Sequence, residues 1–131
     1  MHTGHLPFKI AIMIGESSAL EREDVAILRG AALFSDVSNE VVEPFLAKAS
    51  VRLLQNREIL FRPQHTAEFI FIVLRGKIQV YRGETAGKHA VLSVFLPGSA
   101  VALEAGLAQG IYGMTAEAVG MCRLLEIPAQ A

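Results

Sequence analysis

The residues that could do chemistry are few and scattered along this sequence of 131 residues. The single cysteine can form neither an internal disulfide nor a CxxC zinc motif, and no His-x-His pair is present. A cupin-type metalloenzyme needs several histidines and a glutamate on facing strands, so the ligand count argues against one. No Gly-x-Ser-x-Gly elbow offers a serine nucleophile. We therefore predict that the chain is not an enzyme and holds no metal ion.

Heme is the one cofactor that the sequence leaves open. Its axial ligand would be a histidine, the cysteine or the N-terminal amine. A lone histidine at a strand end is more often a polar surface residue, and the cysteine lies in an apolar run that favours a buried, inert thiol. A single cysteine also fits a reducing cytoplasm. The candidate ligands are His2, His5, His65, His89 and Cys122.

The composition indicates one globular domain. Hydrophobic residues make up 52%, charged residues 19%, and the formal net charge is −1, without the basic excess typical of nucleic-acid binders. The longest apolar run near the start, Ile10 to Ile14, is far shorter than the roughly 20 residues of a membrane-spanning helix. We expect residues 1–17 to form an N-terminal extension and residues 18–131 to form the domain.

Helical signals are confined to the first part of the domain. Ser18 and Glu21 have the spacing of a capping box, and Gly30 is a suitable end for the helix that follows. The apolar repeat of this helix leaves Asp24 on the exposed side. A second helix is predicted over residues 38–49, and a short one between Ala100 and Ala108.

After residue 50 the hydrophobic period changes from helical to two. Short runs rich in Val, Ile, Leu and Phe alternate with turn residues, which indicates a sandwich or barrel-like β fold. The predicted strands are Val51 to Leu54, Glu58 to Phe61, Glu68 to Leu74, Lys77 to Arg82, Ala90 to Leu96, Gly113 to Val119 and Met121 to Ile127.

The order of these elements resembles the sensory domain of Crp/Fnr-type regulators over residues 26–128. The segment Phe69 to Arg82 is similar to the strand, glycine and returning strand of a hairpin in that family. Leu96 to Ser99 resembles the turn that opens its ligand cassette, and Leu124 to Pro128 resembles its last strand. The resemblance implies a mainly β fold, an antiparallel, jelly-roll-like β-roll of the cyclic-nucleotide-binding type with short flanking helices.

The same resemblance implies a function. The domain would sense a small-molecule effector for a bacterial transcription regulator, and a homodimer is the habit of the family. DNA would be read only by a helix-turn-helix domain after the roll, which these 131 residues do not include. The ligand-pocket candidates carried over from the family are Val101, Ala102, Leu103, Glu104, Ala105, Gly106, Tyr112 and Thr115.

The cassette departs from the cyclic-nucleotide pattern. Ser99 replaces an aspartate, residues 102–104 read Ala-Leu-Glu without the usual Gly-Glu pair, and the phosphate-binding arginine would fall near Tyr112. No Arg or Lys occurs between Lys88 and Arg123. Because a phosphodiester in an apolar pocket needs a cation, tight binding of cyclic AMP or cyclic GMP is not expected.

Two turns of the family also look altered. Asn56 stands where a glycine is usual, and it tolerates a positive φ. Gln64 and His65 stand where a Gly-Asp pair is usual, so the second turn is expected to differ in shape. Glu104 is interpreted as a helix-terminal or surface charge rather than a ligand contact.

A different class of function stays open beside the sensor. Loss of the phosphate signature is also compatible with a stand-alone protein-interaction or dimerisation module that binds no small ligand. Exposed apolar surface would be its sign.

Overall fold

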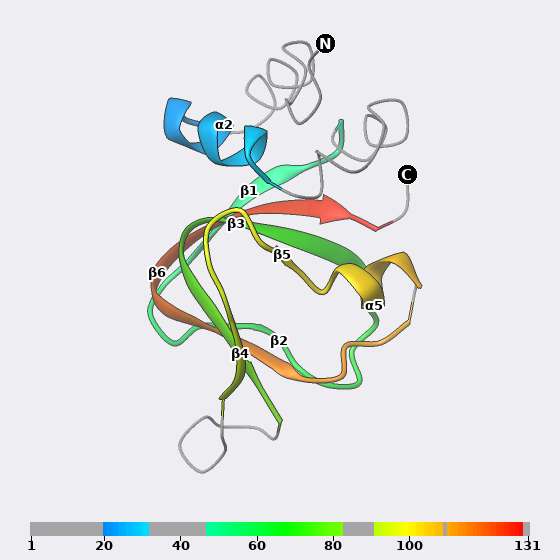
Figure 1. Ribbon diagram of the computed structural model, residues 1–131. Coiled ribbons are helices and arrows are strands. Elements are labelled where there is room, and N and C mark those ends of the chain that lie inside the picture. Colours follow the sequence, from blue (N-terminus) through cyan, green and yellow to red (C-terminus); the bar gives the residue numbers. More distant parts are fainter. Residues whose placement is uncertain (1–19, 32–46, 83–90, 109, 130–131) are drawn as a thin grey trace.

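A computed structural model of the chain describes residues 20–31, 47–82, 91–108 and 110–129 (Figure 1). The predicted extension over residues 1–17, most of the predicted helix over 38–49, and the candidates His2, His5 and His89 lie outside these residues. The described elements are α2 (Arg22–Arg29), β1 (Ser50–Leu54), β2 (Ile59–Phe61), β3 (Phe69–Tyr81), β4 (Val91–Phe95), β5 (Ala100–Val101), α5 (Leu103–Leu107) and β6 (Thr115–Pro128).

The architecture is an antiparallel roll built on two long strands, β3 and β6. They pair along their whole lengths, from Phe69 opposite Pro128 to Tyr81 opposite Thr115. One half of this pair carries β1 and β5, and the other half carries β2 and β4. Because both long strands bend in the middle, the two halves face each other across the core (Figure 1). The predicted β-roll with short flanking helices is confirmed.

The predicted break at Gly76 is wrong, because the chain does not return there as a hairpin. β3 continues through Gly76 at φ 85°, and β6 likewise continues through Gly120 at φ 77°. The register between the two strands shifts around Gly76, which is how the bend is accommodated. A strand glycine marks a turn or a bend equally well, so the sequence could not distinguish the two.

Close packing at the bend leaves no room for a side chain at Gly76. A Cβ atom there would lie 2.5 Å from the carbonyl oxygen of Met121 and 2.8 Å from Sγ of Cys122. The Cys122 thiol donates to the carbonyl oxygen of Lys77 at 3.0 Å. Cys122 is buried, as predicted from its apolar run.

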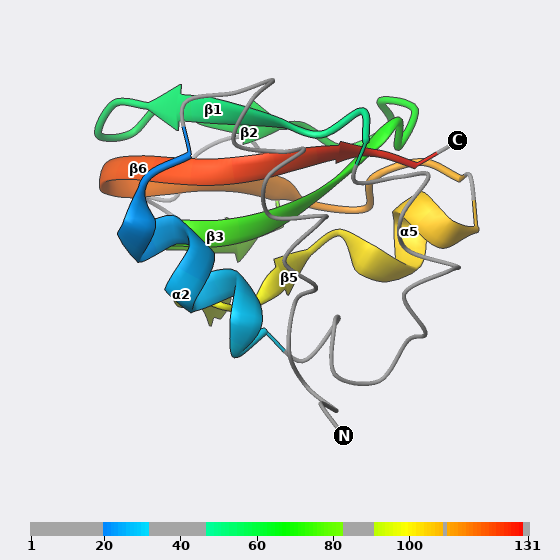
Figure 2. The ribbon, with the colours of Figure 1, turned by 90° about the horizontal axis from the view of Figure 1, so that it is seen from above.

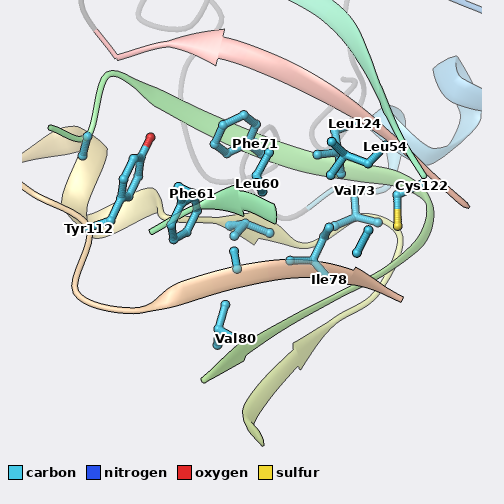
Figure 3. Packing of buried hydrophobic residues seen from close by; sticks show 14 residues of the cluster. Leu54, Leu60, Phe61, Phe71, Val73, Ile78, Val80, Tyr112, Cys122 and Leu124 are labelled. Atoms are coloured by element: carbon cyan, nitrogen blue, oxygen red, sulfur yellow. The ribbon is translucent and has the colours of Figure 1, made fainter. Parts of the chain in front are cut away.

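The core lies between the two halves of the roll (Figure 3). Leu54, Phe71, Val73, Ile78 and Leu124 are each at most 1% exposed and come from three different strands. Fully burying a side chain of this size stabilises the folded state by about 1.5–3 kcal/mol. These contacts hold together strands that are far apart in the sequence.

Helix α2 begins one turn later than predicted. The observed capping box joins Glu21 and Asp24, and the Glu21 amide donates to Oδ2 of Asp24 at 2.7 Å. Ser18, the predicted cap, lies outside the described residues. The prediction that Asp24 is exposed is wrong, since it is 1% exposed and faces the sheet.

Ion pairs fasten α2 to the roll, beside β3 (Figure 2). The buried guanidinium of Arg123 donates to Oδ2 of Asp24 from Nε at 2.9 Å and from Nη2 at 2.8 Å. The hydrogen bond to Asp24 raises the pKa of Arg123. Its neighbour on β3, Arg75, reaches Glu21 and Glu23 at 3.2 Å each, in an exposed position where ion pairs contribute little.

The turns around β2 use left-handed residues that are not glycine. The prediction for Asn56 is wrong, because its neighbour Arg57 takes the positive φ of 72°. The Asn56 side chain instead accepts a hydrogen bond from the amide of Gly120 at 2.7 Å. In the second turn Gln64 has φ 75°, so the conformation that suits glycine is kept without one.

Candidate functional site

A cavity of about 390 Å³ opens between α5 and the roll. Its walls come from β2, β3, β4 and β5, from α5, and from the loop that leads to β6. The lining residues are Phe61, Val80, Phe95, Ala100, Val101, Ala102, Leu103, Glu104, Ala105, Tyr112, Gly113 and Met114. We call it the α5 cavity.

Six of the eight predicted pocket residues line the α5 cavity: Val101, Ala102, Leu103, Glu104, Ala105 and Tyr112. The two others have packing positions. Gly106 is buried, and a Cβ atom there would lie 2.5 Å from Cγ1 of Ile70. Thr115 is fully buried at the start of β6. Neither is among the residues that line this cavity.

Helix α5 is held against the roll by its backbone and by small residues. Its N-cap, Ala102, takes the left-handed conformation at φ 65°, and the carbonyl oxygen of Ala102 accepts from the amide of Gly106 at 3.0 Å. The missing side chain of Gly106 lets the helix approach Ile70 on β3. The turn before β5 is anchored too, because the amide of Gly98 donates to the carbonyl oxygen of Val73 at 2.8 Å.

Tyr112 lines the α5 cavity, and its ring lies close to Phe61 (Figure 3). Its ring stacks on Phe61 with centroids 3.9 Å apart and planes 10° apart. Its hydroxyl donates to the carbonyl oxygen of Phe69 at 3.1 Å and lies 3.3 Å from the Phe69 amide, which donates to it. Burial raises the pKa of this hydroxyl, so it stays protonated over the physiological range. Both hydrogen bonds of the Tyr112 hydroxyl are thus made with the backbone of Phe69 in β3.

Charge in the cavity is limited to one carboxylate. Glu104 is the charged member of the lining set, and it is exposed on the first turn of α5. Among the described residues that line the cavity there is no Arg or Lys. An anionic ligand would lose its hydration here without gaining a cation in return.

A second cavity of about 490 Å³ lies on the other side of the stacked rings and shares Phe61 and Tyr112 with the first. This second cavity is the more polar of the two. Arg52 lines it, and Nη1 of Arg52 lies 3.1 Å from Oε1 of Glu126. The other lining residues are Leu60, Gln64, His65, Thr66, Glu68, Phe69 and Phe71.

Comparison with known proteins gives the same domain. The family model for the cyclic nucleotide-binding domain matches residues 51–131, a segment that contains α5 and, except for Ser50 of β1, the six strands of the described residues. The chain belongs to this family. The resemblance to the sensory domain of Crp/Fnr-type regulators is thereby confirmed at the level of the domain. No curated protein matches the chain.

Two solved structures are similar in sequence as well as in fold. A protein from Ruegeria pomeroyi, provisionally named a cyclic nucleotide binding protein, is 30% identical with a TM-score of 0.72, covering 82% of this chain and 47% of its own. A provisionally named cAMP-binding regulatory protein from Silicibacter pomeroyi is 29% identical with a TM-score of 0.73, covering 83% of this chain and 50% of its own. The chain therefore spans about half the length of these two proteins.

A third structure shares the fold at lower identity. The sensor domain of the transcriptional regulator DNR from Pseudomonas aeruginosa is 23% identical with a TM-score of 0.68, covering 85% of this chain and 76% of its own. At this identity the similarity shows a shared fold.

The α5 cavity lies at the segment that follows the Pro97-Gly98 turn, which resembles the ligand cassette of the family in sequence. Ala102 adopts the left-handed conformation that a glycine takes at least cost, at the point where the family's Gly-Glu pair is absent. Sequence reasoning missed Phe61, Val80, Phe95 and Met114. They reach the cavity through strand pairing and the loop before β6, and an alternating apolar pattern alone does not give the strand register.

The heme candidates are separated in the fold. His65 lies at the second cavity, while the Cys122 thiol is in the core beside Lys77. Within the described residues no group of three His, Cys, Asp or Glu side chains is placed to hold a metal ion. Within the same residues, no helix is long and apolar enough to cross a membrane.

A buried polar cluster sits away from both cavities. Oε1 of Glu117 accepts from the Tyr81 hydroxyl at 2.6 Å, and Oε2 accepts from Nε2 of Gln79 at 3.3 Å. Arg57 lies 3.8 Å from Oε2. Burial, and then the bond to Glu117, raise the pKa of Tyr81 to about 12. None of these residues lines either cavity, so we interpret the cluster as a structural contact within the sheet.

Proposed function

We propose that this chain is the effector-sensing regulatory domain of a bacterial transcription regulator in the cytoplasm, and that its ligand binds in the α5 cavity. The observation that carries the proposal is the position of the cavity, between the family's ligand cassette and the roll. Its volume of about 390 Å³ lies in the range of small-molecule sites. No catalytic step, metal or heme is part of the proposal.

The finer part of the proposal is that cyclic AMP and cyclic GMP are not tight ligands. The described residues that line the cavity include the carboxylate of Glu104 and no cation, so the negative charge of a phosphodiester would be repelled and would find no opposite charge. Binding would shift the population of the domain between two arrangements, which is how an effector at one site can control a distant one. About half of each similar protein lies beyond the matched domain, which supports a receiving part outside these residues.

The test is calorimetric titration with both cyclic nucleotides, next to a thermal-shift screen of small metabolites. We expect dissociation constants above roughly 100 µM for both nucleotides, that is, binding weaker than about 5.5 kcal/mol. A metabolite that binds should lose affinity in Ala105→Leu, which fills the cavity, and keep it in Ala108→Leu, which sits at the exposed end of α5. Submicromolar cyclic AMP binding that Ala105→Leu removes would refute the finer part.

A second function has one observation in its favour. Strand β4 is an edge of the sheet, and Leu92, Val94 and Leu96 on or next to it are each about half exposed. Such apolar surface supports a protein-interaction or dimerisation module with no small ligand. Light scattering after size exclusion tests it: Val94→Lys should turn a dimer into a monomer, while Leu53→Lys, on exposed Leu53 of β1, should not. A monomer at all concentrations contradicts self-association.

A further inference from the structure

We infer that the ligand of the α5 cavity is an uncharged, predominantly apolar molecule, an inference that rests on the proposed function. The nearest chemical class is a small aromatic or alicyclic compound with at most one neutral polar group. The inference concerns what the cavity selects, and it stands on the groups that line it.

The first argument is the apolar surface that a ligand would meet. Val80 and Phe95 come from the sheet, Val101 from β5, Leu103 from α5 and Met114 from the loop before β6. These side chains surround the cavity from several elements, so a bound molecule contacts carbon on more than one side. Each Å² of apolar surface removed from water contributes about 25 cal/mol to binding.

The second argument is the absence of polar groups that await a partner. The Tyr112 hydroxyl is bonded to both the carbonyl oxygen and the amide of Phe69. Apart from this hydroxyl and the carboxylate of Glu104, the described side chains that line the cavity carry no nitrogen or oxygen atom. A polyhydroxylated ligand would therefore find too few side-chain partners for its hydroxyl groups, and polar groups that are buried without partners cost free energy.

The third argument is the sign of the charge at the rim. Glu104 is an exposed carboxylate in the lining of the cavity, and its neighbour Leu103 is uncharged. An anion would therefore meet repulsion as well as the cost of losing its hydration. A cation would lose its hydration as well, and Glu104 would repay little of this cost because an exposed carboxylate is screened by water. An uncharged molecule avoids these costs.

The second cavity provides an internal contrast. It is lined by Arg52, which pairs with Glu126 at 3.1 Å, and also by the carboxylate of Glu68. Of the two cavities, the second is the one whose described lining includes an arginine, so an anion that binds this domain is expected there. The stacked rings of Phe61 and Tyr112 line both cavities. The location of a bound anion can therefore be read from variants.

A matched pair of probes tests the inference: 2-naphthalenemethanol, which is neutral, and 2-naphthoate, which has the same rings and a carboxylate. Both are titrated by calorimetry at neutral pH into the full 131-residue chain and four variants. Ala105→Leu and the milder Ala100→Val fill the α5 cavity, Ala108→Leu is the control on the same helix, and Arg52→Ala removes the cation of the second cavity. Circular dichroism checks that each variant is folded.

We expect the neutral probe to bind at least about tenfold more tightly than the anion, a difference of about 1.4 kcal/mol. Its affinity should fall about tenfold in one or both filled variants and stay within about twofold in Ala108→Leu and Arg52→Ala. Equal or tighter binding of naphthoate, lost on filling the cavity, overturns the inference and leaves the proposed site intact. Binding of the neutral probe that only Arg52→Ala removes overturns both, and so does a chain that binds neither probe and no metabolite in the screen.

Discussion

Replacing Gly76 by alanine tests the bend on which the roll depends. Gly76 lies in the left-handed region at φ 85°, where an L-residue costs about 1–2 kcal/mol. The new Cβ atom would lie 2.5 Å from the Met121 carbonyl oxygen and 2.8 Å from Sγ of Cys122, so the strands must separate. Overpacking of this kind costs about 1–3 kcal/mol. We expect Gly76→Ala to lower the free energy of unfolding by about 2–5 kcal/mol, a large part of the stability of a typical domain.

Gly98→Ala separates the two contributions. Gly98 has a similar φ of 94°, but nothing lies within 4 Å of where its Cβ atom would be. This variant should therefore show only the conformational cost, about 1–2 kcal/mol, partly offset by the reduced freedom of its unfolded chain.

Urea unfolding followed by far-ultraviolet circular dichroism measures both variants, since the chain has no tryptophan. The difference between the two free energies isolates the close approach of β3 and β6. If Gly76→Ala costs no more than Gly98→Ala within about 0.5 kcal/mol, the strands are not clamped at the bend and the reasoning is refuted.

Three further predictions concern buried charge, tyrosine ionisation and strained turns. Asp24→Ala leaves the buried guanidinium of Arg123 without that carboxylate, so urea unfolding should show a loss of about 3–5 kcal/mol, and a loss below about 1 kcal/mol would mean that α2 is not anchored there. The pKa of Tyr81 is raised to about 12, so the stabilisation of the fold by the protonated Tyr81 hydroxyl is complete below pH 10 and is lost as the pH rises through 12. The urea midpoint should fall over that pH range in the wild type and fall less in Tyr81→Phe. Equal falls in the two proteins would contradict the raised pKa of Tyr81. Gln64→Gly should raise the free energy of unfolding by about 0.5–1 kcal/mol because φ is 75°, whereas a decrease would show that the glutamine side chain is needed.

The strands were predictable because each keeps one apolar face, but their connections were not. The alternation around Gly76 is the same for a hairpin and for one bent strand. The choice depends on β6, whose own Gly120 bend lies about 45 residues further along the chain. Pairing at such separation leaves no mark in a local pattern.

Most of the predicted site residues that line the α5 cavity are neighbours in the sequence, and several of the lining residues that were not predicted come from other parts of the chain. Residues of the cassette such as Val101 and Leu103 follow each other in sequence, and they line the cavity together. Phe61 and Phe95 read as ordinary core residues of separate strands, and only the folded sheet brings them to the same wall. Asp24 was misjudged for a similar reason, since its buried partner Arg123 is 99 residues away.

The ligand cassette keeps its shape without charged contacts. The turn before β5 is held by the backbone of Val73, α5 by the close approach of Gly106 to Ile70, and Tyr112 by the backbone of Phe69. None of these contacts involves a group that a phosphate would need. A chain in this family can therefore lose the cation that binds phosphate and still fold around the same cavity, because the residues that build the cavity and those that would select an anion are different ones. This separation would permit the change of ligand class that we propose, with the roll unchanged.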